Sequence, residues 1–139
     1  MTAIRSTAIA LASAMLLLSS QDLGARSKTS AEYGMCMDNV DLGAVKNSQW
    51  ASCAEQEIKR QDVILNSEYK KLRESLSTEQ DASLVTAQKS WLTFREDWCR
   101  FAETSEEAPG GINNYHFCII ELTSRKIDQL RGYQEVSGG

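Results

Sequence analysis

The sequence has a single proline, Pro109, and few runs of β-branched residues. Strands favour β-branched and aromatic side chains, so this composition offers little material for a β-sheet. We therefore predict an all-α protein.

Imidazoles are also scarce, since His116 is the only histidine, and no two of the four cysteines are close together. Zinc sites in proteins combine several cysteine or histidine ligands, often in closely spaced pairs. We therefore predict that the protein holds no metal ion, and nothing in the sequence calls for a cofactor.

The apolar run near the N-terminus, Thr7–Leu18, is shorter than the roughly 20 residues that a membrane-spanning helix needs. It follows a basic residue, Arg5, and leads to a small residue, Ala25, which is the pattern of a Sec-type export signal. We predict that residues 1–25 are a signal peptide that is removed. No cysteine follows the run closely, so we expect no lipid anchor and a periplasmic or secreted protein.

Basic residues do not outnumber acidic ones: 15 Lys and Arg against 19 Asp and Glu give a net charge of −4. Removal of residues 1–25 takes away Arg5 and Asp22, one charge of each sign, so the mature chain keeps this value. A mildly acidic chain is an unsuitable partner for nucleic acid, whereas a cationic protein fits its charge. The remaining 139 − 25 = 114 residues are enough for one small domain with one core.

Four cysteines, an even number, in a small exported chain predict two disulfides. We favour the sequential pairing, Cys36–Cys53 and Cys99–Cys118, because each pair straddles a predicted turn. The midpoint between Cys99 and Cys118 falls at Pro109, as expected of a clamp across a helix–turn–helix. A rival pairing stays open, because folding the first two long helices together would bring Cys53 near Cys99.

Apolar residues at three- and four-residue spacing predict helices over residues 49–76, 79–103 and 113–131. The apolar positions are Ala51, Ala54, Ile58, Leu65, Tyr69, Leu72 and Leu76 in the first helix, Leu84, Ala87, Trp91, Phe94, Trp98 and Phe101 in the second, and Ile119, Ile120, Leu122, Ile127 and Leu130 in the third.

Short breaks separate these helices. Ser77 and Gln80 have the spacing of a capping box, and the stretch around Pro109 cannot continue a helix. The short first break makes the first two helices antiparallel neighbours. We thus predict an antiparallel helical hairpin plus a third helix, a small bundle stapled by two disulfides. Three further ranges complete the predicted organisation: a short helix or irregular segment over 26–48, the helical domain over 49–131, and a frayed tail over 132–139.

One carboxylate interrupts the apolar stripe of the first long helix. Asp62 would be costly to bury unpaired. Folding the hairpin about residue 77 places it roughly one turn from Arg95, whose guanidinium offers a rigid fork of donors to a carboxylate. As a general base, Asp62 lacks a neighbouring nucleophile, metal or second perturbed acid, so we predict that the protein is not an enzyme.

The same fold sets Asn66 opposite Gln88, a second polar pair between the two helices. Such pairs fix the register of helices that could otherwise slip. We interpret these polar side chains and two aromatic ones as a structural network comprising Asp62, Asn66, Tyr69, Gln88, Trp91 and Arg95.

The segment between the second and third helices is acidic and has a stiff proline beside two flexible glycines. A disulfide at its base would hold it ready for a partner and lower the ordering cost of binding. Acidic loops are usually only solvated, and that alternative stays open. The candidate partner-binding residues are Glu103, Glu106, Glu107, Pro109, Gly110 and Gly111.

Three stretches resemble the LprI-like family of small exported helical proteins. They are "CAEQEIKRQDVILNSEYKKL" at residues 53–72, "LVTAQKSWLTFREDWCRF" at residues 84–101, and a closing segment with two glycines, Cys118 and "LTSRKIDQL". The resemblance implies paired cysteines, a place in the bacterial envelope and, from the family's namesake, lysozyme inhibition. The namesake is a lipoprotein, and its anchor cysteine is absent from this sequence.

We therefore expect an exported, non-enzymatic protein-binding module whose partner is a cationic protein such as lysozyme. The alternative is a structural or accessory periplasmic protein that binds another envelope partner. The sequence leaves both open, because any acidic surface on a disulfide-stapled bundle would look similar.

Overall fold

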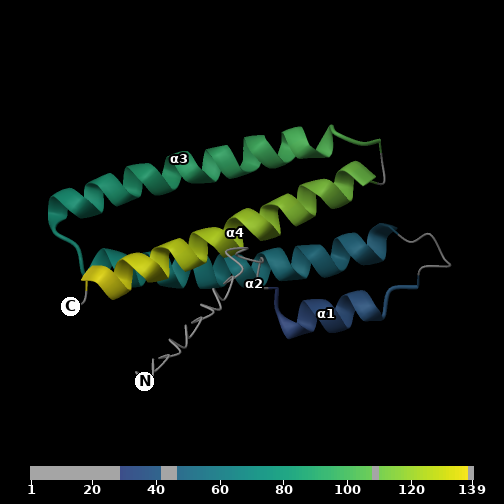
Figure 1. The fold of residues 1–139 in the computed structure, drawn as a ribbon, viewed down its shortest axis with the longest axis horizontal. Coiled ribbons are helices and arrows are strands. Elements are labelled where there is room, and N and C mark those ends of the chain that lie inside the picture. Colours follow the sequence, from purple (N-terminus) through teal and green to yellow (C-terminus); the bar gives the residue numbers. More distant parts are fainter. Residues whose placement is uncertain (1–28, 42–46, 108–109, 138–139) are drawn as a thin grey trace, which may run out of the picture.

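The computed structural model describes residues 29–41, 47–107 and 110–137. These residues form no strand and the helices α1 (Ala31–Asp38), α2 (Asn47–Glu74), α3 (Thr78–Glu103) and α4 (Gly110–Ser137). The predicted all-α hairpin with a further long helix is confirmed (Figure 1). Among these residues no helix has the length and apolar character needed to cross a bilayer. The predicted signal peptide, residues 1–25, lies outside the described residues.

Local signals in the sequence account for the turn between α2 and α3. Ser77 Oγ accepts a hydrogen bond from the Gln80 N–H at 3.3 Å, and Gln80 Oε1 accepts one from the Ser77 N–H at 3.0 Å. This is the predicted capping box, which satisfies N–H groups that the start of a helix leaves free. Across the same turn Arg73 donates two hydrogen bonds to Asp81, at 2.5 and 2.8 Å. The end of α2 is thus tied to the first turn of α3.

The helices pack in an order that differs from their order along the chain. α4 packs along both α2 and α3, and α1 packs on α2, so the helices lie in the order α3, α4, α2, α1 in Figure 1. The prediction that the two hairpin helices are each other's packing neighbours is wrong, although they run antiparallel. α4 can serve two partners because its buried residues cover a wide arc of the helix; they include Ile119, Ile120, Thr123, Ser124, Ile127 and Leu130.

The core consists of two clusters that both involve α2 and α4. The first cluster also includes α1, and its members are Tyr33, Cys53, Ala54 and Ile120. The second lies toward the turn between α2 and α3, and its members are Leu65, Leu72, Ile127 and Leu130. Most of these side chains belong to the apolar stripes predicted for the first and third long helices.

Three aromatic members of the stripe predicted for α3 do not face the core, whereas Trp91 packs against it. Phe94, Trp98 and Phe101 are all half-exposed or more, whereas Gln88 and Cys99 are buried. Because Cys99 is bonded to α4, it fixes which side of α3 faces inward. Successive residues of a helix are turned by about 100°, so Trp98 lies outside this interface.

The sequential disulfide pairing is confirmed. Cys36–Cys53 joins α1 to α2 with Cα atoms 5.7 Å apart, and Cys99–Cys118 joins α3 to α4 at 5.4 Å. The rival pairing required α2 and α3 to be neighbours, and α4 lies between them. In the chain-entropy model each loop of this length stabilises the fold by roughly 3 kcal/mol.

The two ends of the described chain are more ordered than a frayed segment would be. α1 is the short helix expected within residues 26–48, with Ser30 as its N-cap. The prediction of a frayed tail over residues 132–139 is wrong for residues 132–137, because α4 continues to Ser137. Gln134 Nε2 donates to the backbone oxygen of Glu68 at 2.9 Å, so a contact with α2 holds this end of the helix.

Two glycines of α4 give opposite predictions for alanine substitution. A Cβ at Gly111 would collide with the backbone oxygens of Glu103 and Glu106, whereas a Cβ at Gly132 would meet open space. We expect Gly132→Ala to raise the melting temperature, because alanine favours a helix over glycine by about 1 kcal/mol. We expect Gly111→Ala to lower it. Thermal unfolding followed by circular dichroism measures both, and equal stabilisation by the two changes would contradict the close approach at Gly111.

Candidate functional site

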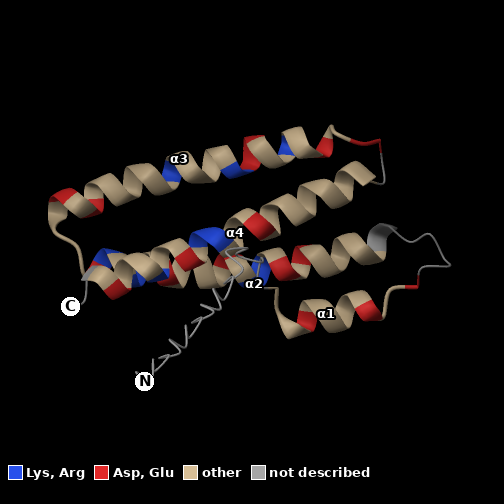
Figure 2. Cartoon of the chain, in the orientation of Figure 1, with Lys and Arg blue, Asp and Glu red and all other residues tan. Residues whose placement is uncertain are grey.

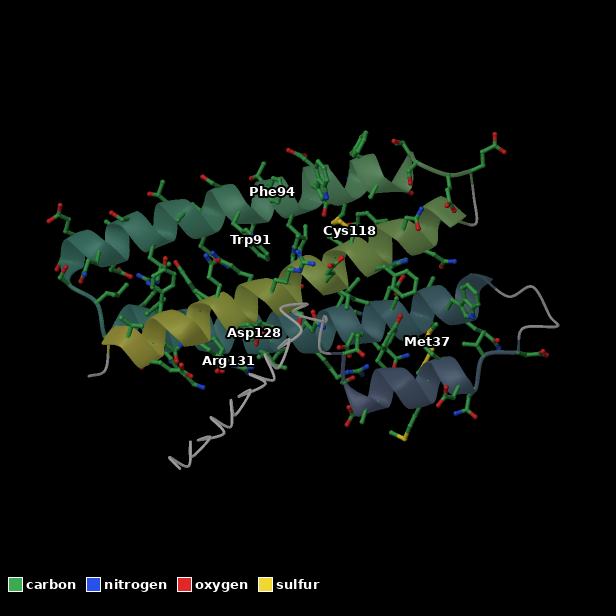
Figure 3. The ribbon with its side chains drawn as sticks, in the orientation of Figure 1. Met37, Trp91, Phe94, Cys118, Asp128 and Arg131 are labelled. Atoms are coloured by element: carbon green, nitrogen blue, oxygen red, sulfur yellow. A yellow bond between two sulfur atoms is a disulfide. The ribbon has the colours of Figure 1, made fainter. Side chains whose placement is uncertain are left out.

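Arg95 joins three helices within the fold. Its Nη1 donates to Asp62 Oδ1 of α2 at 2.9 Å and to Thr123 Oγ1 of α4 at 2.8 Å. The guanidinium carbon also lies 5.2 Å from the centre of the Trp91 ring, and Trp91 lies between α3 and α4 in Figure 3. The two residues that the sequence analysis paired are in contact, and Thr123 is a partner that it missed.

Trp91 has a second cation beside it. The Lys126 Nζ lies 5.7 Å from the centre of the ring, and burial lowers the pKa of this ammonium group. An indole near two cations gains from the attraction between positive charge and the ring face. Trp91 and Arg95 thus act together in the interface between α3 and α4.

The exposed fractions of the two side chains in this ion pair are the reverse of those expected, because Asp62 was predicted to be the buried partner. The Asp62 side chain is 40% exposed, and the Arg95 side chain is only 14% exposed. The Arg95 guanidinium is therefore the charged group whose burial costs free energy. The Asp62 carboxylate, at the edge of the fold, offsets this cost by pairing with it. Asp62 itself is not a buried acid.

The remaining members of the predicted network are separate from this contact. Asn66 is exposed, and the buried Gln88 has an Oε1 with no hydrogen-bond partner in the described part of the chain. The predicted Asn66–Gln88 pair is therefore wrong, because its register assumed direct packing of α2 on α3. Tyr69 is half-buried, with the Arg73 guanidinium carbon 5.5 Å from its ring centre.

The buried carboxylates of α2 are Glu57 and Glu68, neither of which the sequence analysis singled out. Glu57 is 1% exposed. Its two oxygens accept hydrogen bonds from the Ser30 N–H at 3.0 Å, Ser30 Oγ at 2.5 Å, Arg60 Nε at 3.1 Å and Gln61 Nε2 at 3.0 Å. The N-cap of α1 is thereby fastened to α2. One signal for this role was available, since Glu57 lies four residues after Cys53 and so on the same side of the helix.

Glu68 has a similar role at the other end of α2. Its carboxylate accepts hydrogen bonds from Lys71 at 3.2 Å, Gln134 at 3.3 Å and Arg131 at 3.5 Å. Burial by itself would raise the pKa of Glu68, but the hydrogen bonds and the charges of Lys71 and Arg131 outweigh it and lower the pKa. The ionised Glu68 therefore fastens the end of α4 to α2.

Glu57 also lines the wall of a cavity of about 490 Å³ formed by the start of α1, α2 and α4. Arg60, Gln61, Ile127 and Arg131 are among the other lining residues. Burial by itself would raise the pKa of Glu57, but the hydrogen bonds from Ser30, Gln61 and Arg60 outweigh it and lower the pKa. A carboxylate held in its ionised form by neighbouring donors is unsuited to act as a general acid.

The described residues contain no group of three His, Cys, Asp or Glu side chains that could hold a metal ion. His116 lies edge-on to Tyr115, with ring centres 5.6 Å apart. Tyr115 donates to Glu96 Oε2 at 3.0 Å; burial, followed by this hydrogen bond, raises the pKa of Tyr115. That the protein is not an enzyme stays a prediction.

The acidic loop follows α3 at the end of the bundle that the Cys99–Cys118 disulfide closes. Glu103, Glu106 and Glu107 form no ion pair with any described residue. Figure 2 shows red without blue in this connection, whereas both colours alternate along α2. Gly110 and Gly111 begin α4, and Pro109 lies outside the described residues. The structure thus places Glu103, Glu106, Glu107, Gly110 and Gly111 at the same connection between α3 and α4, and their role in binding a partner stays a prediction.

Removal of Glu57 tests its role in holding α1. Because the folded-state pKa of Glu57 is lowered from its ordinary value of 4.5, its stabilising contribution is present above that pH and is lost as the pH falls through the folded-state pKa. We expect Glu57→Gln to cost about 1–3 kcal/mol at pH 7 and to flatten the loss of stability below pH 4.5. Thermal melts between pH 3 and pH 7 measure this; Glu55→Gln, on an exposed side of α2, is the control. Identical pH profiles for the two variants would contradict the assignment.

Replacement of Asp62 tests whether its carboxylate stabilises the buried Arg95 guanidinium. Asp62→Ala leaves Arg95 with one partner fewer, and we expect a loss of about 1–3 kcal/mol in the free energy of unfolding. Arg95→Met in the same background should recover part of that loss, because it removes the unpaired charge. Denaturant unfolding of the single and double variants gives the coupling energy. The exposed Asp97→Ala serves as the control, and a melt for Asp62→Ala equal to this control would exclude the pair as a stabilising contact.

Comparison with known proteins places this architecture in a family. Residues 41–130 match the model of the family described as Lysozyme inhibitor LprI. Neither the curated proteins nor the solved structures contain a match to the chain. The matched range covers more than half of the sequence and contains α2, α3 and the Cys99–Cys118 disulfide. The chain therefore belongs to the LprI family of lysozyme inhibitors.

Proposed function

We propose that this protein is an exported, non-enzymatic module that binds and inhibits a cationic lysozyme. Membership of the LprI family supports the inhibitory role. The two disulfides support an oxidising compartment, the periplasm or the exterior, because thiols are kept reduced in the cytosol. The observation that carries the proposal is the concentration of unpaired carboxylates at one end of the bundle.

The excess of acidic over basic residues is concentrated in one part of the sequence. From residue 101 to residue 124 the chain has the four acidic residues Glu103, Glu106, Glu107 and Glu121 and no lysine or arginine. On α2, in contrast, the carboxylates of Glu57, Asp62, Glu68 and Glu74 each have a cationic partner within the fold. The end that contains the loop therefore has an excess of negative charge, with Glu103, Glu106 and Glu107 in no ion pair with a described residue.

A negative end of this kind complements a cationic enzyme. Vertebrate-type lysozymes are strongly basic, and complementary fields raise the rate of encounter between two proteins. The Cys99–Cys118 disulfide holds the ends of α3 and α4 together, so little chain must be ordered when the loop meets a partner. Charge thus favours fast association, and the disulfide limits the entropy lost on binding.

A lysis assay tests the proposal. Purified oxidised protein is expected to slow the lysis of bacterial cell walls by a vertebrate-type lysozyme, and reduction of its disulfides is expected to weaken this effect. Glu106→Lys with Glu107→Lys should slow association by about tenfold at low salt and flatten its salt dependence. Glu55→Lys with Glu135→Lys, an equal charge change at exposed positions of α2 and α4, should act much less.

Two outcomes separate the parts of this proposal. Inhibition that is unchanged by the loop variant would exclude the loop as the contact. No inhibition by the oxidised wild-type protein would exclude lysozyme as the target, and capture of an endogenous partner from envelope extract would then support an accessory envelope role.

A further inference from the structure

Four aromatic side chains near the Cys99–Cys118 disulfide are exposed to an unusual degree. Phe94 is 50% exposed, Trp98 51% and Phe101 64% on α3, and Phe117 is 50% exposed on α4. The Phe94 and Trp98 rings stack with centres 6.1 Å apart, and the Trp98 and Phe101 rings lie 5.6 Å apart. We call these four residues the aromatic face. Exposed clusters of large apolar side chains are costly in a soluble protein and mark interaction sites.

The aromatic face extends into a shallow hollow between α3 and α4. Trp98 and Phe117 both line a pocket of about 390 Å³, together with Cys118 and Leu122. The disulfide forms part of its wall, so the two helices that frame the hollow are covalently fixed. The lining of the hollow combines these apolar side chains with polar ones, which include Ser105, Asn114 and Glu121. A rigid hollow of this kind suits a partner side chain that has both an apolar stem and a charged end.

The charges around this face are unbalanced. The cations at its edge are already paired, Arg100 with Glu96 at 2.7 Å and Arg125 with Glu121. Asp97 lies three residues after Phe94 and four before Phe101, on neighbouring turns of α3, and it is exposed without an ion pair to any described residue. The face therefore presents aromatic rings beside free carboxylates.

We infer that the aromatic face is the docking surface for a cationic protein, which inserts arginine or lysine side chains between its rings and the adjacent carboxylates. An arginine can stack on an aromatic ring and pair with a carboxylate at the same time. The acidic loop then steers the partner, and the aromatic face provides the contacts that hold it. This inference rests on the proposed function in taking the partner to be cationic.

Charge disfavours other occupants of the same face. A second copy of this chain would bring its own unpaired carboxylates against Asp97 and Glu103, and like charges brought together across an interface cost several kcal/mol. An anionic lipid surface would be repelled for the same reason. A basic protein alone gains from both features of the face.

The test removes the rings and keeps the charges. Trp98→Ser with Phe101→Ser changes two exposed positions, and Val63→Ser with Val136→Ser changes two other exposed apolar positions on α2 and α4. Thermal melts and thiol counts verify that each variant is folded with both disulfides formed. Binding kinetics are then measured on two immobilised probes, a vertebrate-type lysozyme and a peptide of ten arginines.

We expect the Trp98/Phe101 variant to bind both probes about tenfold more weakly, mainly through faster dissociation, because buried aromatic anchors dominate interface energies. The Val63/Val136 variant should stay within about twofold of the wild type. Equal binding by the two variants on both probes would overturn the inference. So would sedimentation showing a wild-type dimer that Trp98→Ser and Phe101→Ser dissociate, because a second copy would then occupy the face.

The two probes separate this inference from the proposed function. If the wild type inhibits lysozyme and the Trp98/Phe101 variant inhibits equally well, the docking surface is wrong and the function stands. If the wild type does not bind lysozyme but binds the arginine peptide through Trp98 and Phe101, the proposed lysozyme inhibition is wrong and the inference that the aromatic face binds cations is supported. If the wild type binds neither probe, both are wrong.

Discussion

The position of α4 between α2 and α3 is the constraint on which the rest of the structure depends. The Cys99–Cys118 disulfide fixes it covalently and determines which side of α3 faces the core. With Cys99 fully buried, Arg95 reaches Thr123 and Asp62 from the same interface. The aromatic side of α3 is then left outside. The α3–α4 interface that this bond closes thus contains the Arg95 contacts on its inner side and leaves the aromatic face on its outer side.

Polar groups in this fold fall into two populations. Those inside, Glu57, Glu68 and Arg95, are surrounded by donors or acceptors from other helices and fasten α1 and the end of α4 to α2, and α3 to both. The second population consists of Glu103, Glu106 and Glu107 at the end of the α3–α4 hairpin, which have no ion-pair partner within the described residues. The first population holds the scaffold together because unpaired buried charges are costly. In the proposed function the second population attracts the cationic partner.

The proposed function gives the acidic loop and the aromatic face complementary roles in binding a cationic partner. The electrostatic attraction of carboxylates acts over distance and is screened by salt, so in the proposed function it sets the association rate of a basic partner. Aromatic rings act only at contact, so they govern how long it stays. The disulfide lies at the base of both features. We propose that the acidic loop and the aromatic face form one binding surface on a rigid support.

The sequence by itself determined the local features of this protein. Helix formation, the capping box of Ser77 and Gln80, the chain reversal and the sequential disulfides depend on neighbouring residues or on short loops, and each was predicted. The tertiary structure decided which faces meet. The insertion of α4 made the Asn66–Gln88 register wrong and left Trp98 exposed, and the start of α1 covers Glu57. These outcomes depend on contacts between residues far apart in the chain, and helical periodicity gives the direction of a side chain relative to its own helix but not the neighbour that covers it.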